Sequence, residues 1–206
     1  TRNESDERIV HFTAMDDYNE PIWVAGKILS LHHNGVKYRD IAVLYRSNYL
    51  SRGLEKALLD QHIPYRIYGG VRFYDRAEIK DALSYLRLLA PKVEGDDKEL
   101  FKNLAVKRII NLPKRGIGAK TLETLEQEAA VKDTNMYEIL KQGGFGKGKA
   151  KESIAKFVEV IEASRSCVDT ISIDQLLSKV LEDSGYMEML RNDAEIERLE
   201  NLKELI

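Results

Sequence analysis

The sequence predicts an α/β part followed by an all-helical part. Up to residue 91, short apolar segments alternate with segments whose apolar residues recur at helical spacing. A polar stretch from Pro91 to Asp97 ends that alternation, and beyond it only helical spacing is found. Strands that alternate with helices are typical of a parallel sheet. We therefore expect a parallel sheet with its helices in residues 1–91 and a helical domain in residues 92–206.

In the first part, three segments are expected to be strands and three to be helices. The run 41–45 (Ile-Ala-Val-Leu-Tyr) is apolar throughout, as in a parallel strand that is buried on both faces. The helix expected over 79–90 carries apolar side chains every three or four residues. The other expected strands are 9–12 and 65–68, and the other expected helices are 18–33 and 51–61.

In the second part, two apolar faces at helical spacing predict helices that pack into a core. Their residues are Ile154, Phe157, Val158 and Ile161 for one face, and Ile173, Leu176, Leu177, Val180 and Leu181 for the other.

The bulk composition limits the class of function. The net charge is −2 although 32% of the residues are charged, so a site for a polyanion has to be a local patch. The single cysteine, Cys167, excludes an internal disulfide and suits a reducing compartment. No apolar run approaches the roughly 20 residues of a membrane span. Because the chain starts with Thr1 and ends in an expected helix, we expect it to be a fragment of a longer protein.

Two basic stretches without acidic residues, 107–121 and 141–151, carry the clearest functional signal. Each is rich in glycine and leads into an expected helix. Glycines let backbone amides approach an anion, and a helix N-terminus attracts it, so these stretches predict a site for nucleic-acid phosphates. The predicted DNA-binding residues are Lys114, Arg115, Gly116, Ile117, Gly118, Lys120 and Thr121 in the first stretch, and Gly144, Gly146, Lys147 and Lys149 in the second. The alternative is a pair of tight turns between helices with solvated lysines.

The two stretches are also related to each other. Gly116-Ile117-Gly118 and Gly144-Phe145-Gly146 align at a constant offset, which predicts an internal repeat of a helix-turn-helix unit. This form resembles the helix-hairpin-helix motif, whose Gly-x-Gly turn offers amides to the DNA backbone. Such contacts are independent of sequence because phosphates carry no base identity.

Residues 143–149 also spell G-x-x-x-x-G-K, the phosphate loop of nucleotide hydrolases, but the context excludes that interpretation. Position 150 is Ala150, which has no hydroxyl for magnesium, and residues 136–140 are expected to be helical rather than a buried strand. No apolar strand that ends in Asp-Glu supplies a second metal ligand. The four histidines show no metal-ligand spacing, so no metal site is predicted.

Tyr45 and Arg46 close the expected strand 41–45. Ligands of parallel sheets bind at the carboxyl ends of the strands. A tyrosine there can stack on a base and an arginine can reach a phosphate. Taken alone, the pair is also an ordinary dipeptide at the end of a strand.

Several segments resemble superfamily 1 helicases of the UvrD/PcrA/Rep type. They are 41–48 (IAVLYRSN), 63–81 (IPYRIYGGVRFYDRAEIKD) and 110–118 (INLPKRGIG), and segments 184–186 and 199–202 extend the resemblance to the end of the chain. Its central block is highly specific. The resemblance implies a partial RecA-like motor domain, with residues 1–91 as the first part of domain 2A. Residues 92–206 would then be the helical 2A/2B junction and the first part of domain 2B.

The same resemblance implies roles and partners. Tyr45 would stack on the adenine of ATP, and Arg46 would act as a catalytic arginine finger at the γ-phosphate. ATP and Mg²⁺ would be bound by the full-length protein, whose phosphate loop and metal-binding acids lie in domain 1A, so this chain alone should hydrolyse no ATP. The implied partners are single-stranded DNA, the duplex junction, domains 1A and 1B and the rest of 2A and 2B, in the cytoplasm and without a membrane.

Two other functions stay open at this point. One is a stand-alone DNA-binding module with hairpin motifs and no motor. The other is a protein-interaction domain whose lysines are merely solvated.

Overall fold

The computed structural model describes residues 9–91 and 98–206. Their contacts form two compact units, Thr1–Phe73 and Tyr74–Ile206, which we call the first and the second unit. The predicted division after residue 91 concerns the domains of the whole protein and stays a prediction. Most of the polar break, residues 92–97, lies outside the described residues.

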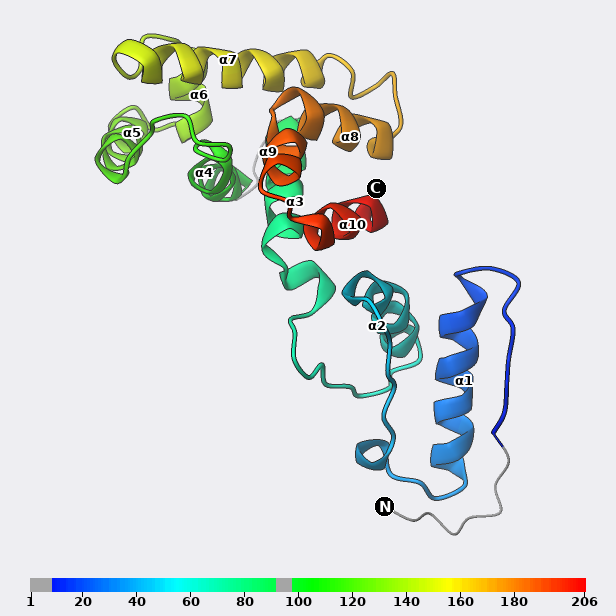
Figure 1. Cartoon of the computed structure of the whole chain (residues 1–206). Helices are drawn as coiled ribbons and strands as arrows, with labels where there is room; N and C mark the ends of the chain where they lie inside the picture. The colour runs from blue at the N-terminus through cyan, green and yellow to red at the C-terminus, as the bar shows by residue number, and fades with distance from the viewer. Residues whose placement is uncertain (1–8, 92–97) are drawn as a thin grey trace. The chain divides into compact units, whose positions relative to one another are not determined.

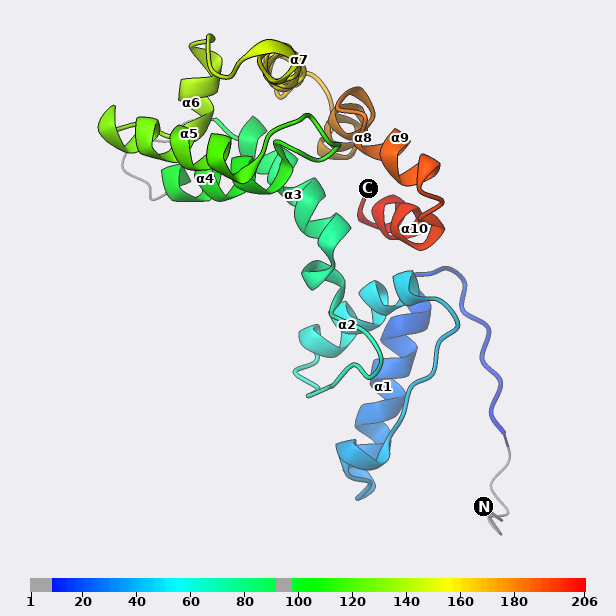
Figure 2. The ribbon, with the colours of Figure 1, turned by 60° about the vertical axis from the view of Figure 1, so that its left-hand side comes forward.

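The first unit is built on two helices that pack against each other, α1 (Asn19–His33) and α2 (Ser51–Asp60) (Figures 1 and 2). Two short 3-10 turns, η1 (Tyr38–Asp40) and η2 (Asn48–Leu50), lie between them in the chain. The helices predicted over 18–33 and 51–61 are therefore confirmed to within a residue or two. The small core consists of Ala25, Ile28, Ala57, Leu58 and Ile63.

The predicted parallel sheet was wrong. Residues 9–12, 41–45 and 65–68 form no strand, and the described part of the chain contains no sheet. A strand exists only where a neighbouring strand completes its hydrogen-bond ladder, and an apolar run does not provide that neighbour. Ile41 has extended backbone angles and packs against the core of the unit, but Val43 and Leu44 are exposed. The run is thus half-buried at its two ends, Ile41 and Tyr45, and exposed between them.

The second unit is helical throughout its described residues, as predicted for residues 92–206. Its central helix is α3 (Ala77–Leu89), which follows the 3-10 turn η3 (Phe73–Asp75). Helices α4, α7, α8 and α10 all pack against α3 (Figure 1). The remaining bounds are α4 (Lys98–Ile109), α5 (Ala119–Val131), α6 (Met136–Lys141), α7 (Gly148–Arg165), α8 (Ile173–Asp183), α9 (Tyr186–Asn192) and α10 (Ile196–Leu205).

Local sequence explains where α3 forms and where α6 begins. On α3, the fully buried Ile79, Ala82, Tyr85 and Leu88 follow the helical spacing that predicts it. Helix α6 starts after Asn135, whose side-chain oxygen accepts a hydrogen bond from the Glu138 amide at 2.9 Å, as an N-cap does.

None of the described helices combines the length and the apolar character that crossing a membrane requires.

Candidate nucleic-acid interface

Residues 110–118 connect α4 to α5, and we call them the first glycine loop. The side chain of Asn111 organises this loop from inside. Its Oδ1 accepts hydrogen bonds from the amides of Arg115, at 2.7 Å, and Ile117, at 3.2 Å. The Ile117 side chain is buried, and the Tyr85 hydroxyl of α3 donates to the Leu112 carbonyl at 2.8 Å. The loop is thereby anchored to the core on its inner side.

The outer side of the first glycine loop is open. Gly116 has φ +72°, a conformation that favours glycine, and nothing lies within 4 Å of the position a Cβ would take. Helix α5 begins directly after Gly118, whose carbonyl accepts its first intrahelical bond from the Leu122 amide at 3.2 Å. The first amides of a helix have no partner within it and carry partial positive charge. The exposed lysines Lys114 and Lys120 flank this helix start.

Arg115 differs from those two lysines. Its guanidinium donates to the carbonyls of Ile109, Ile110, Pro113 and Ser184, at 3.0–3.3 Å. It also lies over the ring of Phe157, with Cζ 5.1 Å from the ring centre. The side chain is half-buried and faces the protein, whereas the sequence groups Arg115 with the phosphate-binding residues.

Residues 142–147 connect α6 to α7, and we call them the second glycine loop. Gly143, Gly144 and Gly146 all have positive φ, between +76° and +84°. A Cβ on Gly146 would lie 3.3 Å from Ile154 Cδ1, so close packing as well as backbone conformation favours glycine there. Lys147 is exposed at the start of α7, as is Lys149 two residues further along.

Each glycine loop therefore joins two helices, but the two loops differ in detail. In the aligned positions, Gly116 and Gly144 both have positive φ, whereas Gly118 has φ −90° and Gly146 has φ +84°. Helix α5 starts one residue after the second aligned glycine, and α7 starts two residues after it. The segment before the second loop is helix α6, which agrees with excluding a nucleotide-hydrolase phosphate loop there.

A groove of about 780 Å³ lies between α5 and the second glycine loop. It brings together five of the predicted DNA-binding residues, Lys120, Thr121, Gly144, Gly146 and Lys147. Its wall on α5 continues with Thr124, Glu128 and Lys132, and the opposite wall includes Ile139, Gln142, Gly143, Phe145 and Ala150. Residues 20 or more positions apart in the sequence thus share one concave surface. Lys114 and Lys149 do not line the groove.

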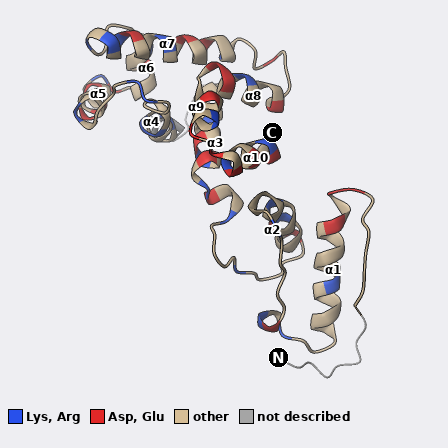
Figure 3. Ribbon diagram, in the orientation of Figure 1, with Lys and Arg blue, Asp and Glu red and all other residues tan. Residues whose placement is uncertain are grey.

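The charge of the groove is positive. Glu128 is paired with Lys132 at 2.7 Å, which leaves Lys120 and Lys147 as the cations of the lining without an acidic partner among the described residues. Figure 3 shows Lys and Arg at the loop before α5 and at the start of α7. Backbone amides of glycines in the left-handed conformation add partial positive charge that a phosphate can use.

A carboxylate joins α6 and α7, the two helices that flank the second glycine loop. Glu162 of α7 accepts hydrogen bonds from the Tyr137 hydroxyl and from Arg165, both at 2.8 Å, and pairs with Lys141 at 2.9 Å. Arg165 also donates to the Leu88 carbonyl at the end of α3. Burial alone would raise the pKa of Glu162, but these hydrogen bonds and the nearby positive charges outweigh it and lower that pKa. Burial and the bond to Glu162 raise the pKa of Tyr137.

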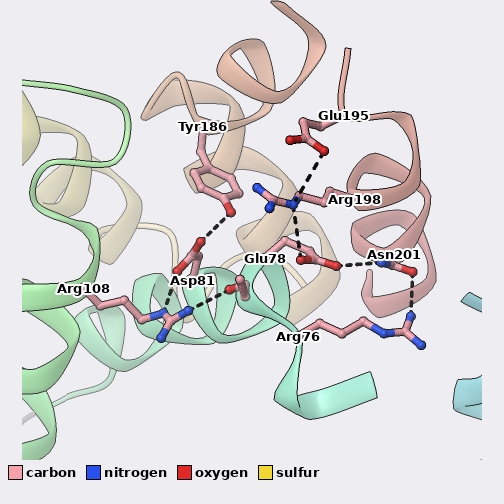
Figure 4. A network of polar contacts seen from close by, with 9 residues as sticks. Arg76, Glu78, Asp81, Arg108, Tyr186, Glu195, Arg198 and Asn201 are labelled. Carbon is pink, nitrogen blue, oxygen red and sulfur yellow. Dashed lines mark hydrogen bonds and ion pairs between the residues drawn. The ribbon is translucent and has the colours of Figure 1, made fainter. Parts of the chain in front are cut away.

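A buried polar network that the sequence did not reveal joins α3 to α4 and α9 (Figure 4). Asp81 of α3 accepts hydrogen bonds from Arg108, at 2.6 Å, and from the Tyr186 hydroxyl, at 2.7 Å. Arg108 donates also to the Ala77 carbonyl. Burial and the contact with Asp81 raise the pKa of Tyr186.

A second branch of the network joins α3 to α10 (Figure 4). The Asn201 amide group donates to Glu78 at 2.6 Å, and its oxygen accepts from Arg76 at 2.7 Å. Arg198 lies 3.9 Å from Glu78 and 3.8 Å from Glu195. Charged residues on an amphipathic helix are usually solvated, so only the tertiary structure identifies Glu78 and Asp81 as buried. In the sequence, segments 63–81 and 199–202 show only the family resemblance.

The residues predicted for nucleotide binding lie in the first unit. Tyr45 is half-buried and Arg46 is exposed, in the extended segment that follows η1. They do not close a strand, since none forms there. Over residues 9–91 and 98–206, no group of three or more His, Cys, Asp or Glu side chains could hold a metal ion.

The model of the UvrD-like helicase C-terminal domain family matches residues 1–206. The match covers the whole chain. The chain belongs to this family. The resemblance found in segments such as 63–81 and 110–118 is thereby confirmed.

Curated relatives of similar sequence are named ATP-dependent DNA helicase PcrA. The proteins of Bacillus subtilis (strain 168), Staphylococcus epidermidis (strain RP62A) and Staphylococcus aureus (strain Mu50) are 38%, 37% and 36% identical to this chain. Each alignment covers all of the chain but 28% of the relative. The chain thus spans little more than a quarter of the length of these helicases, and its similarity to PcrA concerns that portion.

Proposed function

We propose that this chain is part of an ATP-dependent 3′–5′ DNA helicase, acting in repair or replication, and that its second unit grips the DNA backbone. Membership of the UvrD-like family and the similarity to PcrA support the helicase assignment. The groove between α5 and the second glycine loop carries the assignment of the DNA contact, because it gathers Lys120, Thr121, Gly144, Gly146 and Lys147.

The chemistry of the groove suits a phosphate backbone. Two lysines without acidic partners supply charge, and glycine amides and the Thr121 hydroxyl supply hydrogen-bond donors at short range. The open face of the first glycine loop, with Lys114, Gly116 and Gly118, extends the same kind of surface, and Lys149 on α7 adds a further cation. Ile117 supports this surface from inside the loop, because its side chain is buried and its amide donates to Asn111. Contacts of this type hold DNA without reading its sequence.

For the nucleotide, we propose that Tyr45 stacks on adenine and that Arg46 approaches the γ-phosphate in the intact protein. The exposed position of Arg46 is compatible with a contact to ATP. Magnesium would be held by the phosphates and by acidic residues elsewhere in the protein, since the described residues offer no cluster of ligands. The remaining motor and inserted domains would then be obligatory partners, and the protein would work on cytoplasmic DNA.

The main proposal is tested by measuring the affinity of the chain for DNA at several salt concentrations. A protein that neutralises Z phosphates of duplex DNA shows a log–log slope of about −0.9Z. We expect the double variant Lys120→Ala/Lys147→Ala to bind duplex DNA more weakly and to flatten that slope by roughly 2, because two cationic contacts are lost. The matched control is Lys27→Ala/Lys37→Ala, which removes the same charge from exposed positions of the first unit. Equal binding by both double variants and the unmodified chain would contradict the proposed DNA contact.

The nucleotide proposal has a separate test. The chain by itself should show no magnesium-dependent ATP hydrolysis, and hydrolysis by the purified chain would contradict the division of the site between domains. In the intact protein, Arg46→Ala should lower the rate of ATP hydrolysis by roughly 10³ or more, as loss of an arginine finger does.

A further inference from the structure

Arg115 connects the first glycine loop to three other segments of the second unit. Its guanidinium donates to the carbonyls of Ile109, the last residue of α4, and Ile110, the first residue of the loop, both at 3.1 Å. It donates to Pro113 within the loop at 3.3 Å, and to Ser184, just before α9, at 3.0 Å. Three of these carbonyls lie within six residues of Arg115, and the fourth, that of Ser184, lies 69 residues further along the chain, so one side chain ties the loop to a distant turn.

The aromatic ring of Phe157 on α7 completes the surroundings of Arg115. The guanidinium carbon lies 5.1 Å from the ring centre, within the range of a cation–π contact. Phe157 is itself buried. The turn before α9 also touches the loop, because a Cβ on Gly185 would lie 3.6 Å from the Pro113 ring. The guanidinium therefore faces the interior of the unit, and its donors are directed at protein oxygens.

Only an arginine can make this set of contacts. Guanidinium is planar, has five donors in a fixed fork and stacks on aromatic rings, whereas a lysine ammonium is a compact point charge. The last carbonyls of a helix lack intrahelical partners and carry partial negative charge, so a cation at the end of α4 is favourable. A lysine at position 115 would keep the charge but could not reach four carbonyls from one plane.

We propose that Arg115 is a positioning residue, which holds the first glycine loop in the shape that presents Gly116, Gly118 and the start of α5 to DNA. It does this from the protein side and makes no phosphate contact of its own. The inference rests on the proposed DNA contact and assigns the phosphate-facing cations to Lys114 of this loop and Lys120 at the start of α5. Asn111 acts in the same way, since its oxygen holds the Arg115 and Ile117 amides.

The test compares conservative and charge-removing variants at two neighbouring positions of the chain, with duplex DNA as the probe. We expect Arg115→Lys to weaken binding roughly tenfold, as much as Arg115→Gln, because the charge alone does not hold the loop. Lys114→Gln, which removes a phosphate-facing cation, should also bind more weakly, whereas Lys27→Arg, at an exposed position of the first unit, should bind like the unmodified chain. If Arg115→Gln is too unstable to purify, Arg115→Lys and Asn111→Ala, which leaves every charge in place, make the same test.

Amide hydrogen exchange without DNA gives the second measurement. In Arg115→Lys, the amides at positions 115 and 117 should exchange at least roughly fivefold faster, while Lys114→Gln leaves their exchange unchanged. Full DNA binding by Arg115→Lys, or unchanged exchange at these two amides, would overturn the positioning role. If the unmodified chain binds no duplex DNA, the proposed function fails instead, and the exchange result still decides whether Arg115 holds the loop.

Discussion

The two units of this chain bury their apolar residues to very different degrees. In the second unit, Tyr85 and Leu88 of α3 are fully buried among the helices that surround it. In the first unit, a core of five residues lies between α1 and α2, while Leu44 is 94% exposed and Val43 is 38% exposed. The apolar residues of α3, which recur at helical spacing, are buried against neighbouring helices. The continuous apolar run 41–45 forms no strand and is mostly exposed.

The same contrast holds for buried carboxylates. In the first unit, Glu55 accepts hydrogen bonds from Ser51, at 2.9 Å, from Tyr65, at 3.2 Å, and from the Phe73 amide, at 3.1 Å. Its donors come from one helix and from the segment that follows it. In the second unit, Asp81 and Glu78 join helices that are about a hundred residues apart in the sequence. Buried charges must be paired, and the second unit uses that requirement to link distant helices.

The largest expected effect comes from truncating a core side chain of the second unit. Leu88→Ala should lower the free energy of unfolding by about 2–5 kcal/mol, because it removes buried methyl groups and leaves a cavity. Leu44→Ala, at an exposed position of the first unit, should change it by less than about 0.5 kcal/mol. Urea unfolding followed by circular dichroism measures both. Equal losses would show that Leu44 is covered as well as Leu88 and would remove the contrast between the units.

A smaller effect is expected from the buried network. Tyr186→Phe removes the hydroxyl that donates to Asp81, and should cost about 1–3 kcal/mol because a buried carboxylate loses a hydrogen bond. Tyr68→Phe is the matched control, since Tyr68 is 83% exposed. The same unfolding experiment compares the two variants. A neutral Tyr186→Phe would mean that Arg108 alone satisfies Asp81.

The smallest effect concerns pH. Because the folded state lowers the pKa of Glu162 below its ordinary value of 4.5, this carboxylate stabilises the fold fully above that value and loses its contribution as the pH falls through the lowered pKa. Glu162→Gln should therefore be less stable near neutral pH and should show a weaker pH dependence below about pH 4.5. Urea unfolding between about pH 3 and pH 7 measures this.

The control for this experiment is Glu123→Gln on α5. Glu123 is exposed and makes no ion pair within the described part of the chain. Its pH profile should follow that of the unmodified protein. If Glu162→Gln follows it too, Glu162 does not stabilise the fold through its charge.

Sequence reasoning identified the helices and the glycine loops because both depend on local properties. The spacing of Ile79, Ala82 and Leu88 predicts α3, and the glycines at 116 and 144 mark positions with positive φ. It did not distinguish Arg115 from Lys114, because adjacent basic residues look alike until their neighbours in space are known. It also missed Asp81, whose donors Arg108 and Tyr186 come from other helices.

The sequence by itself determined the helical character of the second unit, the two loops between helices and the family to which the chain belongs, because these follow from spacing, residue type and similarity. Only the tertiary structure decided that the run 41–45 stays unpaired, that Lys120 and Lys147 share one groove, and that Arg115 faces inward. The physical reason is that strand pairing, concave surfaces and hydrogen bonds between distant segments depend on tertiary contacts. Local sequence does not specify those contacts.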